Sequence, residues 1–428
     1  MLTLVRRLEI LVLFFGTRTL IVSLAIWQAL GARASLISLE MGVGYSPYSV
    51  LLILLVLINT HSCLLGLYSI GQLNPRLVIR FILLIVLSLG FFTLTRRLGL
   101  YIIFEIRLVP IFFIIIGWGY QPERVRAGKA IFIYTVWGSL PLLVTILFQA
   151  RSGVSRLEMT SAGRGALVSV ATIPLLAFLV KIPLFLVHMW LPKAHVEAPA
   201  PGSIFLAAVL LKLGGYGLIL FSCLSTSTVG RGFITAVGLW GRVVIALRCA
   251  QSLDVKRLIA LSSVGHIRIA VAIIFRGYRV SMDAGLLVLL THGFRSSLAF
   301  FIRYILYKRF SSRRLVLLKS STRVRGVLVG IWYITLLAVV GCPPSANLWV
   351  EMVVYIRFLA DRGAAIKRLI LAALVRGVYI FIMLGRVGGG LDEVAKTPVA
   401  RRSVDISHAG YRSVLRILVT VLLASVVC

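Results

Sequence analysis

Acidic residues and long polar stretches are both scarce in this chain. Only 13 of its 428 residues are Asp or Glu, against 46 Lys and Arg, which gives a formal net charge of +33 at pH 7. The longest polar stretch, about 386–412, is shorter than a folded domain needs. The sequence therefore excludes a separate soluble domain and leaves most basic side chains without a possible acidic partner.

Cysteine is also sparse, and the spacing of the cysteines matches no metal-binding or disulfide motif. No pair forms a CxxC or comparable motif, so a metal site or a disulfide framework has little support and buried thiols are favoured. A phosphate-binding glycine motif, a set of metal ligands and a nucleophile–base pair are missing too, which disfavours a soluble catalytic role. The cysteines are Cys63, Cys223, Cys249, Cys342 and Cys428.

Apolar stretches fill most of the chain. It is 60% hydrophobic with a mean hydropathy of +1.01, and about fourteen stretches of roughly 17–25 residues are each long enough to cross a bilayer as a helix. We therefore predict an all-α polytopic membrane protein. The stretches are near 9–30, 50–71, 77–95, 98–119, 130–150, 166–192, 201–224, 232–251, 257–275, 283–306, 324–342, 345–360, 365–384 and 412–428.

Some ionisable side chains interrupt these apolar stretches. A charge inside a membrane is expensive, so such a residue is a functional candidate by default. Carboxylate, ammonium and imidazole groups placed in series can also pass protons between them. The pattern thus predicts a proton relay. Its six candidates within the spans are Glu105, Lys181, Lys212, His266, His292 and Glu351.

Proline marks two helix breaks near these residues. Pro183 removes a helical hydrogen bond and biases Ile182 away from helix, which places Lys181 at a break. In the second half, Cys-Pro-Pro at 342–344 interrupts an apolar stretch shortly before Glu351. Interrupted spans at comparable places in two halves are typical of inverted-repeat transporters. A chance pair of prolines is the alternative, since proline is common in membrane helices.

Two histidines follow Lys181 at seven-residue intervals. His188 would share a helix face with Lys181 if the helix resumed after the break, whereas Pro192 interrupts the argument before His195. A lone histidine is more often structural, so both interpretations stay open. The glycines that follow Lys212 are better explained by close helix packing than by ligand contact.

Several segments resemble the antiporter-like membrane subunits of respiratory complex I (NADH–ubiquinone oxidoreductase), which are relatives of Mrp-type cation/proton antiporter subunits. The run HMWLPKAHVEAP is typical of the subunit 4 branch. The resemblance covers about 104–351 in the family's order and is weak at both ends. Its segments are FEIRLVP at 104–110, WGYQPERVRAG at 118–128, YTVWGSLPLL at 134–143, the run at 180–217, DVKRLIALSSVGH at 254–266, THGFRSSLAF at 291–300 and PPSANLWVE at 343–351.

The resemblance implies a fold of about fourteen helices built around two inverted five-helix repeats, each with a discontinuous helix. It implies three regions. Residues 1–97 would form N-terminal transmembrane helices, 98–384 the proton-translocating core, and 385–428 a C-terminal loop with the last helix.

The same resemblance assigns roles within the relay. Glu105 matches the glutamate that pairs with the broken-helix lysine, here Lys181, and Lys212 matches the central lysine. Glu351 matches the acidic residue toward the exit of the channel. Three histidines match polar positions along or near the central axis, namely His188, His266 and His292.

The implied activity is proton passage across the mitochondrial inner membrane, driven by quinone reduction elsewhere in the complex. NADH, FMN, iron–sulfur clusters and ubiquinone would belong to partner subunits, and this chain would hold no cofactor and no metal. Expected contacts are neighbouring antiporter-like subunits and lipid, with cardiolipin a candidate. Nucleic acid is not expected, because the basic residues are dispersed. An Mrp-like antiporter subunit and a passive membrane scaffold are the alternatives.

Arginine departs from the family pattern. Eight arginines within apolar spans would cost at most about 20–28 kcal/mol, while net stability is only about 5–15 kcal/mol. At Arg107, Arg257, Arg268 and Arg295 the family usually has a small residue, whereas Arg124 matches a family arginine.

Our hypothesis is that many of these arginines are encoded by AGA or AGG codons, which several mitochondrial codes read as Ser or Gly. The alternative is a truly basic protein that binds anionic lipid or acidic subunits. The eight are Arg80, Arg107, Arg242, Arg248, Arg268, Arg295, Arg303 and Arg376.

Overall fold

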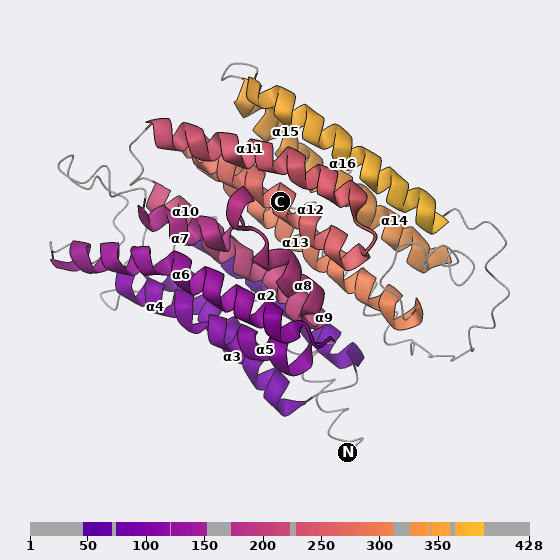
Figure 1. The fold of residues 1–428 in the computed structure, drawn as a ribbon, viewed down its shortest axis with the longest axis horizontal. Coiled ribbons are helices and arrows are strands. Elements are labelled where there is room, and N and C mark those ends of the chain that lie inside the picture. The colour runs from indigo at the N-terminus through magenta and orange to yellow at the C-terminus, as the bar shows by residue number, and fades with distance from the viewer. Residues whose placement is uncertain are drawn as a thin grey trace.

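A computed structural model describes residues 46–70, 74–119, 121–151, 173–222, 228–310, 326–343, 345–359 and 364–388. Over these residues the chain is a bundle of helices that run side by side (Figure 1). The first half contains α2 (Pro47–Ile70), α3 (Pro75–Thr93), α4 (Arg97–Ile106), α5 (Leu108–Trp118), α6 (Arg124–Arg151), α7 (Ile173–Lys181), the short turn η2 (Phe185–Val187), α8 (Trp190–Glu197), α9 (Ala200–Phe205), the π-helical turn η3 (Leu206–Leu210) and α10 (Leu211–Ser222).

The second half contains longer elements. They are α11 (Thr228–Gln251), α12 (Val255–Ile274), α13 (Arg279–Phe310), α14 (Gly326–Val340), α15 (Ala346–Leu359) and α16 (Ala364–Gly388). In Figure 1 the pair α12 and α13 lies between α3–α6 on one side and α11, α15 and α16 on the other.

The expected apolar spans reappear as helices wherever the structure describes them. Within the described residues, seven helices are long and apolar enough to cross a membrane. The expected stretches 9–30 and 412–428, and the first residues of 166–192, lie outside the described part of the chain. Over the described residues the fold is therefore confirmed as all-helical with several possible spans, and the count of about fourteen stays a prediction.

Burial separates the core helices from the peripheral ones. Every residue of α12 except Arg257 is buried, and α13 is buried along nearly all its length. By contrast α6 exposes large apolar side chains such as Trp137 and Phe148. An apolar helix with an exposed apolar face is suited to lipid contact, so α12 and α13 form the core and α6 faces outward.

The predicted break at Lys181 is confirmed. Helix α7 ends at Lys181, and a regular helix resumes only at Trp190. Within the break, the Ile182 N–H still donates to the Phe178 carbonyl at 2.7 Å, but Pro183 has no N–H to continue the ladder. The second break also occurs, between Val340 and Ala346, where Gly341 adopts a φ of 87° that favours glycine.

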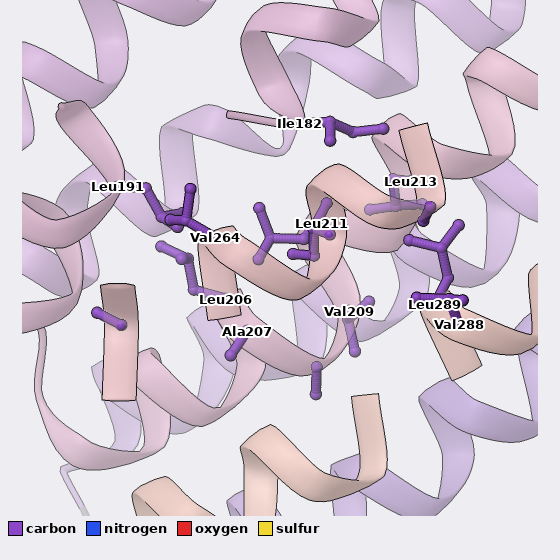
Figure 2. Packing of buried hydrophobic residues seen from close by; sticks show 14 of the residues in the cluster. Ile182, Leu191, Leu206, Ala207, Val209, Leu211, Leu213, Val264, Val288 and Leu289 are labelled. Atoms are coloured by element: carbon purple, nitrogen blue, oxygen red, sulfur yellow. The ribbon is translucent and has the colours of Figure 1, made fainter. Parts of the chain in front are cut away.

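Two further interruptions had no signal in our sequence analysis. Arg107 separates α4 from α5, and the π-helical turn η3 interrupts the span that carries Lys212. A π turn contains one extra residue per hydrogen-bonded loop and is frequent at functional sites. Figure 2 shows apolar side chains around this turn, including Val264 of α12 and Leu289 of α13. Lys212 thus lies in a largely apolar part of the core.

Candidate functional site

Glu105 and Lys181 form a buried ion pair at the first break. The Lys181 ammonium donates to Glu105 Oε1 at 2.8 Å and to the Phe104 carbonyl at 3.0 Å. It also lies 3.2 Å from the centroid of the Phe104 ring. The side chains of Lys181 and Glu105 are 6% and 19% exposed. The pairing expected from the resemblance is therefore present, between the last turn of α4 and the last residue of α7.

Lys212 contacts a histidine from the opposite half of the bundle. Its ammonium lies 2.8 Å from Nδ1 of His292 on α13 and donates to the Ala207 carbonyl of the π turn at 2.5 Å. Lys212 is fully buried. Gly293 makes this approach possible, because a Cβ there would lie 3.2 Å from Lys212 Cε and 2.6 Å from a methyl of Leu55.

A second histidine continues the series. The rings of His292 and His266 are 6.3 Å apart between centroids, with an interplanar angle of 40°. His266 Nδ1 in turn lies 3.5 Å from Glu351 Oε1. Lys212, His292, His266 and Glu351 thus follow one another across α10, α13, α12 and α15.

Glu351 is surrounded by donors. Arg376 of α16 binds it bidentately, with Nη1 to Oε1 at 2.5 Å and Nη2 to Oε2 at 2.7 Å. Asn347 Nδ2 donates to Oε1 at 3.1 Å, and the Tyr355 hydroxyl donates to Oε2 at 3.3 Å. Arg242 Nη2 lies 3.9 Å from Oε1. Our sequence analysis missed Arg376 as a partner, because residues 25 apart on separate helices leave no local signal.

His188 lies elsewhere. The helix does not resume before Trp190, so the seven-residue spacing from Lys181 no longer places His188 on the same helix face. Within the described residues His188 contacts Phe185, through its ring nitrogen to the carbonyl and through a stacked ring at 5.7 Å. The structure therefore brings six of the seven predicted residues into two groups and leaves His188 apart.

His195 shows a different environment. It is fully buried in α8, its ring stacks on Phe300 at 4.8 Å, and neither ring nitrogen has a hydrogen-bond partner. The stacking supports the structural interpretation of this histidine. Within the described residues, no group of three or more His, Cys, Asp or Glu side chains is placed to hold a metal ion.

Comparisons with known proteins agree on one family. A family model described as NADH:quinone oxidoreductase/Mrp antiporter, TM, matches residues 96–374. The NADH-ubiquinone oxidoreductase chain 4 of Albinaria caerulea is 34% identical over 72% of this chain and 72% of its own length. The chain 4 protein of Lumbricus terrestris is 34% identical over 76% and 73%, and that of Struthio camelus 36% identical over 70% and 67%.

Solved structures share the fold. A chain of the structure described as respiratory complex I from Thermus thermophilus with bound NADH aligns with a TM-score of 0.84 at 22% identity, covering 97% of this chain and 90% of that one. A chain of the membrane-bound sulfane sulfur reductase, an archaeal respiratory membrane complex, aligns with a TM-score of 0.82 at 18% identity, covering 96% and 89%. Together with the sequence matches, these findings show that the chain belongs to the NADH-ubiquinone oxidoreductase chain 4 family, within the NADH:quinone oxidoreductase and Mrp antiporter membrane proteins.

Proposed function

We propose that this chain is a proton-translocating membrane subunit of respiratory complex I in the mitochondrial inner membrane. It would act within the H⁺-translocating NADH:ubiquinone oxidoreductase without performing redox chemistry itself. The observation that carries the proposal is the Lys181–Glu105 pair at a helix break, 2.8 Å between charged atoms in a buried site. Chain 4 family membership supports the same conclusion.

The pair can load and release a proton by electrostatics. While Glu105 is ionised, it stabilises the ammonium of Lys181 at 2.8 Å. Neutralising or moving Glu105 removes that stabilisation in a site where burial disfavours an unpaired charge, so the proton leaves. A tenfold change in this equilibrium needs only about 1.4 kcal/mol. A small helix movement at the break could therefore drive transfer toward Lys212.

The second group can carry the proton onward. Lys212 presents an ammonium proton to His292 Nδ1 at 2.8 Å, and a neutral imidazole accepts at one nitrogen while it donates from the other. His292 could pass a proton toward His266, and His266 toward Glu351 at 3.5 Å. Longer steps in this series need an intervening water, which is a normal hydrogen-bond bridge.

We also retain the finer architecture as part of the proposal. The breaks at Lys181 and at 341–345 would be the discontinuous helices of two inverted five-helix repeats, in a fold of about fourteen helices. The core would span 98–384, with helices of 1–97 before it and a loop and last helix in 385–428. Neighbouring antiporter-like subunits and lipid, including cardiolipin, would cover the exposed apolar faces.

The test is proton pumping by the assembled complex. Glu105→Gln or Lys181→Met should reduce quinone-linked pumping while the complex still assembles, because either change breaks the ion pair. Lys193→Met is the matched control, since Lys193 is an exposed lysine on α8. Normal pumping by both variants of the pair would contradict the proposed mechanism.

The family model also covers Mrp antiporters, so cation/proton exchange is the second candidate. Co-purification with complex I subunits and pumping that is independent of added Na⁺ would separate the two. A passive scaffold predicts that none of the buried pairs affects pumping, and the same Glu105 and Lys181 variants test it.

A further inference from the structure

Buried arginines in this structure differ in whether their N–H groups find acceptors. Arg376 binds Glu351 through two hydrogen bonds, and the half-buried Arg124 donates to the Gly119 carbonyl at 2.8 Å. Arg107, Arg242 and Arg268 each keep buried guanidinium nitrogens with no hydrogen-bond partner: Nη1 of Arg107, Nη1 and Nη2 of Arg242, and Nη2 of Arg268. A guanidinium stays charged and always presents five donors. Nε of Arg376 also has no partner, but its other two nitrogens bind a carboxylate, and within the described residues Arg107, Arg242 and Arg268 make no such hydrogen bonds to a carboxylate.

Arg107 contacts the same backbone carbonyl and the same aromatic ring as Lys181. Its Nε donates to the Phe104 carbonyl at 3.1 Å, the same oxygen that accepts from Lys181 at 3.0 Å. Both cations also lie over the Phe104 ring, at 4.6 Å and 3.2 Å from its centroid. Two buried cations thus share one carbonyl and one ring, while Glu105 forms its ion pair with Lys181.

Arg268 has no carboxylate contact within the described residues. It is 0% exposed in the middle of α12, and its guanidinium donates to the Gly241 and Pro183 carbonyls. Nη1 lies so close to α11 that a Cβ on Gly241 would stand 2.7 Å from it. Arg242 lies beside the Tyr355 hydroxyl, and the nearest carboxylate, 3.9 Å away, is one that Arg376 already binds bidentately.

The free-energy cost of burial argues against arginine at positions 107, 242 and 268. A central arginine in a membrane helix costs about 2.5–3.5 kcal/mol, so three cost roughly 8–10 kcal/mol before any unsatisfied donors are counted. Each buried N–H without an acceptor adds about 1–3 kcal/mol. The total is comparable to the whole net stability of a protein, about 5–15 kcal/mol.

Serine at these positions would avoid the cost of burying a guanidinium, and it would need no partner from another helix. Ser262 and Ser263, in the same helix as Arg268, donate their hydroxyls to the carbonyls three residues earlier, at 2.8 Å and 2.7 Å. Ser297 of α13 does the same at 2.7 Å. A serine at a buried helical position therefore satisfies itself from its own backbone, whereas glycine would cost up to about 1 kcal/mol in a helix.

We infer that the protein made in the cell carries serine at positions 107, 242 and 268, and that arginine appears there because AGA or AGG codons are read with the standard code. Glu105 then faces Lys181 without a second cation at the same carbonyl. Near Glu351, the cation at 3.9 Å disappears and the bidentate Arg376 contact remains.

Peptide mass spectrometry of the subunit, purified with its native complex from the source organism, tests the inference. We expect peptides spanning 104–110, 239–245 and 265–271 to contain serine at 107, 242 and 268, and trypsin not to cleave after these positions. The gene should carry AGA or AGG there. Position 124 is the control and should contain arginine.

Arginine in any of the three peptides, or a CGN codon at any of the three positions, would overturn the inference for that position. Glycine would overturn the assignment to serine. Because peptide masses and codons do not depend on proton pumping, these outcomes are independent of whether the proposed function holds.

Discussion

Lys212 and His292 lie 80 residues apart in the chain, yet the lysine Nζ and the histidine Nδ1 are 2.8 Å apart in the core. Gly293, the neighbour of His292, lets α13 approach closely enough for this contact. The pair joins α10 to α13 and begins the series of ionisable groups that continues through His266 to Glu351.

Lys212→Arg tests whether this lysine must lose its proton. The substitution keeps the charge, but a guanidinium does not deprotonate in proteins. We expect proton pumping to fall at least tenfold, as for Lys212→Met, with assembly measured separately by native gel. Lys193→Arg, at an exposed site on α8, should pump normally. If Lys212→Arg pumped normally, Lys212 would be an electrostatic or structural group and not a proton carrier.

Gly293→Ala tests the close approach at the same pair. The added Cβ would meet Leu55 Cδ1 at 2.6 Å and Lys212 Cε at 3.2 Å, so the lysine and its neighbours must shift. We expect lower pumping and a loss of about 1–3 kcal/mol in stability, measured by thermal denaturation of the complex.

Gly377→Ala on α16 is the matched control, since nothing lies within 4 Å of the Cβ it would add. Equal behaviour of the Gly293 and Gly377 variants would show that the core accommodates the extra methyl and that the Lys212–His292 contact tolerates displacement.

Glu351→Gln should destabilise the subunit more than Glu105→Gln does. Removing the Glu351 charge leaves Arg376 buried and unable to deprotonate, which typically costs about 3–5 kcal/mol. Lys181, by contrast, can become neutral when Glu105 loses its charge. Denaturant titration of the purified complex measures the difference.

The double variant Glu351→Gln with Arg376→Met should recover much of this stability, because it removes the uncompensated cation. Failure of the second substitution to restore stability would mean that the Arg376–Glu351 contact contributes little to the fold.

Gly217→Ala tests the packing behind the Lys181 break. A Cβ on Gly217 would stand 2.1 Å from Cε1 of Phe178, one turn before the end of α7. Phe178 also packs edge-on against Phe104 at 5.3 Å. We expect a loss of about 1–3 kcal/mol and weaker assembly, whereas Gly330→Ala, with open space around it, should be neutral in the same thermal assay.

The sequence by itself determined the features that act locally on the backbone. Apolar stretches of sufficient length predicted the helices, and Pro183 predicted the end of α7 at Lys181, because a missing N–H interrupts the ladder whatever packs around it. The resemblance of FEIRLVP and of the run at 180–217 to a known family predicted that Glu105 and Lys181 meet.

The tertiary structure alone decided which side chains face each other across helices. Arg376 meets Glu351, and Lys212 meets His292, because of helix rotation and packing, which apolar sequences specify only weakly. The π turn before Lys212 has no side-chain signature of its own. Arg376 also differs from Arg107, Arg242 and Arg268 in its hydrogen-bond acceptors. That difference depends on the groups that neighbouring helices supply, and a single sequence does not contain that information.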